Sequence, residues 1–283
     1  MESLRARLGA VRARGDTIAL VPTMGNLHEG HLQLVDAARA RAPCVVVSIF
    51  VNPLQFGPTE DFEAYPRTLA ADAAALAGRD VAVLFAPTVN EMYPDGPKLA
   101  TRVRVDGLGD ELCGASRPGH FEGVATVVAK LFNIVQPDLA VFGDKDRQQL
   151  TVIRRMVRDL SMALEIVGVP TVRAADGLAL SSRNGYLDAD ARARAPVLYA
   201  TLLATAERMT AAPGPITELE AEAEARLREA GFEPDYVAIR RIHDLAPPQG
   251  GDRELVVLAA ARLGSTRLID NHPFRLGAPL DAR

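Results

Sequence analysis

Short apolar runs rich in β-branched residues alternate with helical patterns through the first part of the chain, and this alternation restricts the fold more than any other feature. The runs cover residues 17–23, 44–52, 81–87, 139–143 and 164–172. Segments with helical periodicity lie between them, at residues 32–42, 69–78, 121–135 and 147–160. Strands that alternate with helices in this way form a parallel sheet covered by helices. The pattern predicts a doubly wound, Rossmann-like α/β domain, in which ligands bind beyond the carboxyl ends of the strands.

From about residue 172 the character of the sequence changes. Two long segments rich in Ala, Glu and Arg predict helices at residues 189–211 and 216–231. Three strand-like apolar runs follow at residues 235–242, 254–264 and 266–271. We therefore expect two domains, a Rossmann-like domain over residues 1–171 and a second, smaller α+β domain over residues 172–283.

Composition and charge limit the partners that such a protein can have. The 283 residues include 32 Lys and Arg against 36 Asp and Glu, so a net charge of −4 offers no global attraction to nucleic acid or an anionic membrane. No segment approaches the roughly 20 apolar residues that span a bilayer, and the first residues lack the apolar core of a signal peptide. Cys44 and Cys113 make no disulfide framework. We expect a cytoplasmic protein that binds neither nucleic acid nor membranes.

The segment PTMGNLHEGH, residues 22–31, joins the first apolar run to the first helical pattern. A strand that gives way to a helix here places free backbone N–H groups and the positive end of the helix dipole at the sheet edge. His28 and His31 are three apart and share one face of a helix, and Gly25 and Gly30 allow a ligand or a neighbouring backbone to approach closely. The segment is suited to an anion site, in which two imidazoles can donate hydrogen bonds to a phosphate.

Two other interpretations of the histidines remain. Zinc proteases place their histidines four apart with a glutamate after the first, whereas His28 and His31 are only three apart, so metal ligation is disfavoured. Alternatively, both histidines only cap and pack the start of a helix. This segment by itself does not decide between helix packing and phosphate binding.

A longer set of motifs resembles a known family. HEGH resembles the HxGH signature of the nucleotidyltransferase and class I synthetase superfamily. The chain also contains, in this order, VPTMGNLHEGH, SIFVNPLQF, YPRT, RPGHFEGVATVVAKLFNIVQPDLAVFGDKDRQQL and LSSRNGYL. Their order and spacing resemble the pantoate–β-alanine ligase family over most of residues 17–190. The resemblance implies an ATP-dependent condensation of (R)-pantoate with β-alanine to (R)-pantothenate, AMP and diphosphate, through a pantoyl adenylate, in coenzyme A biosynthesis.

The resemblance also implies roles for individual residues. His28, His31 and Lys145 are the implied catalytic residues, with Lys145 stabilising the transition state of adenylyl transfer and Asp146 contacting the ribose. The first domain would bind ATP and pantoate, and the second would act as a lid. The ATP-binding residues that the resemblance implies are Met24, Gly25, Asn26, Leu27, His28, Glu29, Gly30, His31, Gly143, Asp144, Lys145, Asp146, Val172, Leu180, Ser181, Ser182 and Arg183.

The other ligands follow from the same resemblance. Gln55 and Gln149 would hold pantoate with neutral amides, and Arg117 and His120 would line the approach of the amine. Mg²⁺ is implied by the nucleotide, with Asp72 as its candidate ligand. The family also implies a homodimer through the N-terminal domain.

Three positions depart from the family pattern. Ala71 stands beside Asp72 where family members can carry a further acid. Asn26 stands where the family often has Ala, and Leu180 stands where it often has Met. The longer polar side chain of Asn26 would crowd the nucleotide or form a new hydrogen bond with it. The change at Leu180 is apolar and would affect only packing near the adenine.

Two other classes of function also need ATP. One is a nucleotidyltransferase that stops after it has moved AMP to a phosphate or an alcohol, and the other is a non-enzymatic ATP-sensing module. Neither class needs a pocket for a small acid and an amine. Gln55 and Gln149 are the residues that favour the ligase over both.

Overall fold

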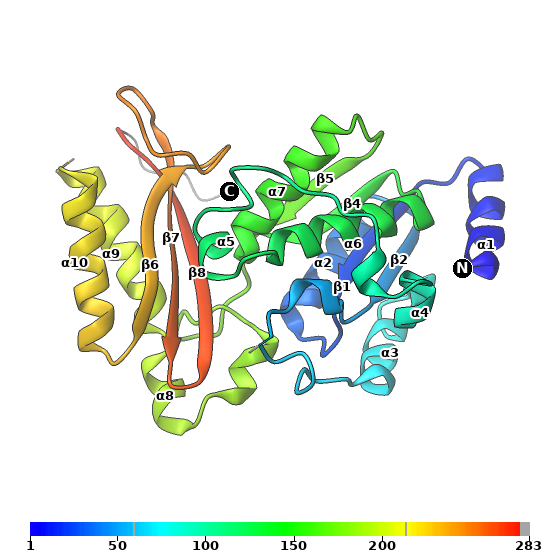
Figure 1. Ribbon diagram of the computed structural model, residues 1–283, viewed down its shortest axis with the longest axis horizontal. Coiled ribbons are helices and arrows are strands. Elements are labelled where there is room, and N and C mark those ends of the chain that lie inside the picture. The colour runs from blue at the N-terminus through cyan, green and yellow to red at the C-terminus, as the bar shows by residue number, and fades with distance from the viewer. Residues whose placement is uncertain (59, 213, 278–283) are drawn as a thin grey trace. The chain divides into compact units, whose positions relative to one another are not determined.

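A computed structural model describes residues 1–58, 60–212 and 214–277 of the chain (Figure 1). Within this part the chain forms two compact units. The first contains Met1–Asp144 and Val152–Pro170, and the second contains Lys145–Thr151 and the chain from Thr171 onward. The short segment Lys145–Thr151 thus belongs to the second unit although it precedes the end of the first. The domain boundary between residues 171 and 172 stays a prediction, and residues 278–283 of the expected second domain lie outside the described residues.

The first unit is built on a parallel five-stranded sheet with the order β3-β2-β1-β4-β5. Each of the five apolar runs supplies one strand, so the prediction of a Rossmann-like α/β fold is confirmed. The strands are β1 (Ile18–Thr23), β2 (Cys44–Ile49), β3 (Val83–Phe85), β4 (Leu139–Gly143) and β5 (Glu165–Val169). This order places β1 at the centre of the sheet, and its carboxyl end leads directly into the histidine-containing loop.

The helices of this part of the chain include the four expected from the sequence and several that were not expected. The four expected helices are α2 (Glu29–Arg39), α3 (Leu69–Ala77), α6 (His120–Val135) and α7 (Arg147–Asp159). The others are α1 (Glu2–Ala13), α4 (Val89–Met92), α5 (Cys113–Ser116) and the 3-10 turns η1 (Pro53–Gln55), η2 (Pro97–Leu99) and η3 (Asp144–Asp146). Helix α1 buries Leu4, Leu8 and Val11, which lie on one face at the spacing of an amphipathic helix.

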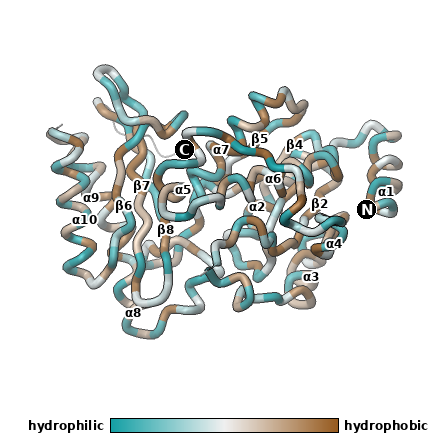
Figure 2. The backbone as a smooth tube through the Cα atoms, in the orientation of Figure 1, coloured by the Kyte–Doolittle hydropathy of each residue, from teal (hydrophilic) through white to brown (hydrophobic). Residues whose placement is uncertain are grey.

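The core of the first unit lies along the central strands. β1 and β2 are buried over most of their length, as expected for parallel strands covered on both faces. Leu34, Val35 and Ala38 of α2 pack into the same core cluster. Figure 2 shows apolar segments along these strands. This packing fixes the strand ends from which the loops of the candidate site emerge.

The second unit contains an antiparallel sheet with the order β6-β7-β8, which confirms the smaller α+β region predicted from the sequence. Its elements are α8 (Ala189–Arg194), α9 (Val197–Ala211), α10 (Ile216–Glu229), β6 (Glu233–Arg241), β7 (Glu254–Leu263), β8 (Thr266–Arg275) and the 3-10 turn η4 (Ser182–Tyr186). The expectation of one continuous helix over residues 189–211 is wrong. The chain forms two helices there, because Pro196 has no N–H for the helical ladder and precedes the first residue of α9.

None of the helices in the described part of the chain is both long enough and apolar enough to cross a lipid bilayer.

Candidate active site

The loop after β1 turns sharply at Gly25. Gly25 has a φ of 82°, and its N–H donates to the hydroxyl of Thr23 at 3.2 Å. A Cβ at this position would lie 3.0 Å from both Oδ2 of Asp72 and Cγ2 of Ile49. The backbone conformation therefore favours glycine here, and any larger residue would also force the side chain of Asp72 or Ile49 to shift.

Asp72 holds this loop from α3. Its side chain is buried, and its two carboxylate oxygens accept the backbone N–H of Asn26 at 3.0 Å and of Leu27 at 2.8 Å. The hydroxyl of Thr68 donates to the same carboxylate at 3.1 Å. Three donors thus fix a side chain whose interactions run mainly to the backbone of the loop.

These contacts bear on the expected magnesium ligand. Among the described residues, no group of three or more His, Cys, Asp or Glu side chains is arranged to hold a metal ion. The oxygens of Asp72 already accept three hydrogen bonds from Asn26, Leu27 and Thr68. The geometry fits a carboxylate that holds the loop better than a direct metal ligand.

His28 and His31 form a reciprocal cap at the start of α2. His28 lies just before the helix in an extended conformation, and its Nδ1 accepts the N–H of Gly30 at 3.1 Å. Nδ1 of His31 accepts the N–H of His28 at 3.3 Å, and the two ring centroids are 4.1 Å apart. The expectation that both histidines lie within the helix is therefore corrected, because His28 is its N-cap.

The cap determines which ring nitrogen carries the proton. A nitrogen that accepts a hydrogen bond from the backbone has no hydrogen of its own, so Nδ1 of both rings is unprotonated. Each neutral imidazole of His28 and His31 then carries its proton on Nε2. Helix capping and anion binding are thus compatible, since the cap uses Nδ1 and makes Nε2–H a donor. The same tautomer opposes metal ligation through Nε2.

Asn26 occupies a backbone position that suits its residue type. Its φ is 51°, in the left-handed region that asparagine tolerates better than most residues. Its N–H donates to Asp72, as described above. The departure from alanine at this position therefore has a local backbone explanation.

Gln55 lies at the end of η1 and is largely buried. Its Oε1 accepts a hydrogen bond from Nδ2 of Asn52 at 3.2 Å, and its Nε2 lies 3.0 Å from Sδ of Met24. The structure thus brings a candidate pantoate-binding glutamine beside the first residue of the histidine-containing loop.

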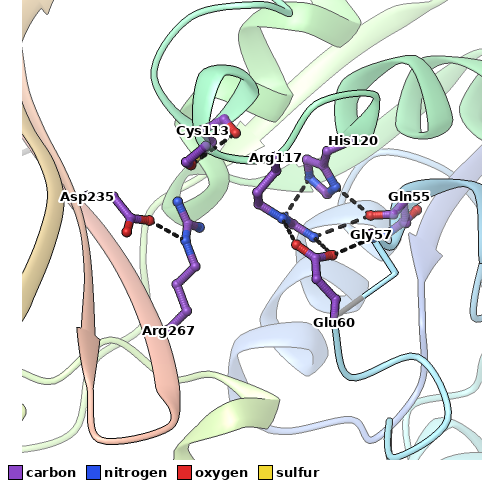
Figure 3. A network of polar contacts seen from close by, with 9 residues as sticks. Gln55, Gly57, Glu60, Cys113, Arg117, His120, Asp235 and Arg267 are labelled. Carbon is purple, nitrogen blue, oxygen red and sulfur yellow. Dashed lines mark hydrogen bonds and ion pairs between the residues drawn. The ribbon is translucent and has the colours of Figure 1, made fainter.

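Arg117 and His120 contact the backbone of Gln55 (Figure 3). The carbonyl oxygen of Gln55 accepts Nδ1–H of His120 at 2.8 Å and Nη2–H of Arg117 at 3.3 Å. Nη1 of Arg117 donates to Nε2 of His120 at 3.0 Å, which leaves Nδ1 as the protonated nitrogen of that ring. In this structure the two residues position the Gln55 loop, and their expected role along the path of the amine stays a prediction.

Glu60 completes this network. Its carboxylate accepts hydrogen bonds from Nε of Arg117 at 2.5 Å and from Nη2 at 2.7 Å, and also from the N–H of Gly57 at 3.1 Å. Partial burial acts to raise the pKa of Glu60, but the hydrogen bonds and charge of Arg117 outweigh it and lower the pKa to about 2. The Glu60–Arg117 pair is therefore charged at neutral pH and holds the loop against the start of α6.

The second unit carries Lys145, Asp146 and Gln149. Lys145 and Asp146 lie in η3, and Gln149 lies in the first turn of α7. The side-chain amide of Asn271, on β8, donates to the carbonyl oxygen of Lys145 at 3.0 Å. The backbone that carries Lys145 is thus attached to the antiparallel sheet.

The remaining candidate ATP-binding residues lie on a tight turn of the second unit. The N–H of Leu180 donates to the carbonyl of Val172 at 2.9 Å. The hydroxyl of Ser181 caps η4 by accepting the N–H of Arg183 at 3.3 Å. The base of the turn is fixed by a bidentate ion pair between Arg173 and the buried Asp270, with distances of 2.7 and 2.9 Å.

The structure therefore places the candidate residues in two groups. The loop of residues 24–31, Gln55, Asp72, Arg117 and His120 belong to the first unit together with Gly143 and Asp144, and the others belong to the second. Sequence reasoning missed Asn52, Glu60 and Tyr93. Asn52 could have been noticed, because an asparagine before a proline often caps a turn.

The Rossmann-like strand order and the histidine-capped helix after β1 define an HxGH-type α/β protein. A sequence model described as "Pantoate-beta-alanine ligase" matches residues 1–273, and the chain belongs to the pantoate–β-alanine ligase family. The expected family is confirmed.

Individual relatives match over nearly their full length. A pantothenate synthetase from Pseudomonas aeruginosa is 60% identical over 271 residues, which cover 96% of each chain. A pantothenate synthetase from Halorhodospira halophila is 59% identical over 97% of this chain and 96% of its own.

Solved structures agree with the sequence matches. The crystal structure of pantothenate synthetase from Thermus thermophilus matches with a TM-score of 0.86 and 52% identity, covering 94% of this chain and 96% of that one. A pantoate-beta-alanine ligase from Francisella tularensis, complexed with "Beta-gamma ATP and Beta-alanine", matches with a TM-score of 0.77 and 34% identity over 94% of each chain.

Proposed function

We propose that this protein is an AMP-forming pantoate–β-alanine ligase, which condenses (R)-pantoate with β-alanine at the expense of ATP in coenzyme A biosynthesis. The observation that carries the proposal is the 60% identity to a pantothenate synthetase over 96% of both chains. The site supports it, because the loop expected to hold the phosphates and the glutamine expected to hold the acid are in contact.

The first step activates the acid. A carboxylate is a poor acyl donor, so one of its oxygens attacks the α-phosphorus of ATP, the bond to the diphosphate breaks, and pantoyl adenylate forms. Negative charge grows on the phosphate oxygens in this transition state and is stabilised by donors that are already in place. His28 and His31 supply Nε2–H donors at the positive end of the α2 dipole, and Lys145 supplies a positive charge.

The second step uses the adenylate. The amine of β-alanine attacks the acyl carbon, the bond to AMP breaks, and the amine nitrogen loses a proton as the amide forms. Gln55, placed by Asn52 and by the network of Arg117 and His120, holds the acid during both steps. Gln149 contributes a second neutral amide from α7.

Magnesium is part of the proposal as a companion of the nucleotide. When bound, Mg²⁺ neutralises charge on the phosphates, and it is usually held by those phosphates and water with few protein ligands. Asp72 already accepts three hydrogen bonds, so it would act on the ion only through water while it holds the N–H groups of Asn26 and Leu27.

The proposal also covers the remaining family expectations. The second unit would serve as a lid over the nucleotide, with Ser181, Ser182 and Arg183 contacting the phosphates. The chain would act as a homodimer through its first unit, which a mass measurement by light scattering would test. The reaction would take place in the cytoplasm, where ATP is available.

An isotope experiment tests the chemistry. Pantoate labelled with oxygen-18 in its carboxylate should give AMP that carries the label after a full reaction, because that oxygen bridges to phosphorus in the adenylate. Label that appears in inorganic phosphate or in the diphosphate, with none in AMP, would contradict the acyl-adenylate route. AMP transfer that does not need pantoate would instead indicate a simple nucleotidyltransferase.

A further inference from the structure

The side-chain amide of Asn52 has only one possible orientation. Its Oδ1 accepts the backbone N–H of Leu54 at 3.3 Å, and its Nδ2 donates to the backbone carbonyl of Gly123 at 3.1 Å. A backbone N–H can only donate and a backbone carbonyl can only accept, so these two groups exclude the flipped amide. The Tyr93 hydroxyl then donates to the same Oδ1 at 2.8 Å.

The orientation of Asn52 determines that of Gln55. Nδ2 of Asn52 donates to Oε1 of Gln55 at 3.2 Å, so the amide oxygen of Gln55 is turned toward Asn52. Its Nε2 is turned the other way and lies 3.0 Å from Sδ of Met24. An NH₂ group has two hydrogens and the sulfur is a weak acceptor, so Gln55 presents a donor to a substrate.

Tyr93 lies at the inner end of this chain of hydrogen bonds. It follows α4, and only 1% of its surface is exposed. Its ring lies 6.2 Å from the ring of Phe50, and Nζ of Lys130 lies 5.5 Å from its centroid. Burial raises the pKa of Tyr93 to about 12, so its hydroxyl keeps its proton at physiological pH.

The packing beneath the chain leaves little freedom. A Cβ at position 123 would collide with the carbonyl oxygen of Leu54, so Gly123 lets η1 lie directly against α6. Asn52 is itself 1% exposed. A buried amide with a missing partner is costly, so each hydrogen bond in the chain supports the orientation of the next.

We propose that Tyr93 is a positioning residue for the ligase reaction, whose hydroxyl supplies a third hydrogen bond to Asn52 and so helps to lock the Gln55 amide as a donor toward an acceptor oxygen of the acid substrate. This inference rests on the proposed function. The lock selects a carboxylate or hydroxyl oxygen and disfavours the flipped amide, which would set an oxygen against the negatively charged acid. The nucleotide loop meets this chain of hydrogen bonds at the weak contact between Nε2 of Gln55 and Sδ of Met24, and the hydroxyl of Tyr93 lies at the other end of the chain.

The test is a double-mutant cycle of Tyr93→Phe and Gln55→Ala. Tyr93→Phe keeps the ring and removes one hydrogen bond, so it should raise the KM for pantoate about 3- to 10-fold and leave the KM for ATP unchanged. In the Gln55→Ala background the same change should have no further effect, because the group through which Tyr93 acts is gone. Tyr236→Phe, on β6, is the matched control and should change neither KM.

The cycle separates the proposal from a purely structural role. If Tyr93→Phe acted only by loosening the packing, it would raise the KM for both pantoate and ATP, and its effect would add to that of Gln55→Ala. Either result would overturn the inference. Wild-type protein that forms no AMP from ATP in the presence of Mg²⁺, pantoate and β-alanine would contradict the proposed function itself. An active wild type with an unchanged Tyr93→Phe variant would contradict the inference alone.

A second variant covers the case in which Tyr93→Phe does not fold. Gln55→Glu keeps an oxygen toward Asn52 but removes the NH₂ donor, so the KM for pantoate should rise more than 10-fold with little change in the KM for ATP. Normal pantoate binding by that variant would show that Gln55 is not a donor to the acid.

Discussion

The carboxylate of Asp72 accepts the backbone N–H of Leu27 at 2.8 Å, although the two residues lie 45 positions apart in the sequence. Together with its bond to Asn26, this contact holds the loop that leads to the histidine cap. The loop conformation is thus determined by a side chain of α3 as well as by its own glycine and asparagine.

Asp72→Asn tests this relationship. The variant replaces one carboxylate oxygen with an NH₂ group, which cannot accept the N–H of Asn26 or of Leu27. One buried N–H then loses its partner, which costs about 1–3 kcal/mol. We expect the KM for ATP to rise roughly 10-fold, with no change in the Mg²⁺ concentration that gives half-maximal activity at saturating ATP. Asp36→Asn, on the exposed face of α2, is the control. A raised Mg²⁺ requirement with an unchanged KM for ATP would make Asp72 a metal ligand instead.

The tautomers of His28 and His31 predict that the protein holds no transition metal. Both rings use Nδ1 in the helix cap and carry their proton on Nε2, which leaves no lone pair for zinc. Metal analysis of purified protein should find no stoichiometric transition metal. Zinc at one ion per chain would refute the assignment of these tautomers.

His31→Ala should lower kcat about 100-fold through loss of one donor to the phosphates.

Lys145→Ala should affect the transition state more than nucleotide binding. A charge directed at the transferring phosphoryl group matters most as negative charge develops there, so kcat should fall by about 100-fold or more while the KM for ATP changes little. Lys98→Ala removes an exposed lysine from η2 and serves as the control. Steady-state kinetics of both variants decide the matter, and near-normal turnover without Lys145 would remove that residue from the mechanism.

The Glu60–Arg117 pair predicts how stability depends on pH. The folded pKa of Glu60 is about 2, below its ordinary value of 4.5, so the charged carboxylate favours the folded state. Its contribution is complete above pH 4.5 and is lost as the pH falls toward 2. Glu60→Gln should therefore lower the urea midpoint at pH 7, and the difference from wild type should shrink below pH 4.5.

The control for this experiment is Glu63→Gln, an exposed acid of the same segment. Its difference from wild type should be small at every pH. A Glu60→Gln difference that stays constant down to about pH 3 would mean that the ion pair does not supply the stability.

The fold could be predicted from the sequence because its main elements are local patterns. The central strands β1 and β2 are nearly continuous apolar runs, since burial on both faces leaves little room for polar alternation. Pro196 is a signal for a break between two helices, but the residues on both sides of it have strong helix propensity and predict one continuous helix. Helix α1 has the amphipathic spacing of Leu4, Leu8 and Val11, but this signal is short and is interrupted by charged residues.

The site was predictable only in part. The histidine-containing loop lies in one continuous segment, so its position after β1 followed from the sequence. The contacts that orient the site residues join distant positions, as with Tyr93 and Asn52, or Asp72 and Leu27. Such pairs leave no periodic signal in a single sequence. The donor role of Gln55 depends on them, and sequence reasoning left its amide as either a donor or an acceptor.

The most direct test of the adenylate mechanism is the exchange of labelled diphosphate into ATP in the absence of β-alanine. Formation of pantoyl adenylate needs ATP and pantoate but no amine, and its reversal returns diphosphate to ATP. We predict exchange when pantoate and Mg²⁺ are present and β-alanine is absent, and no exchange when pantoate is left out. Exchange that proceeds equally well without pantoate, or that requires β-alanine, would contradict the proposed two-step mechanism.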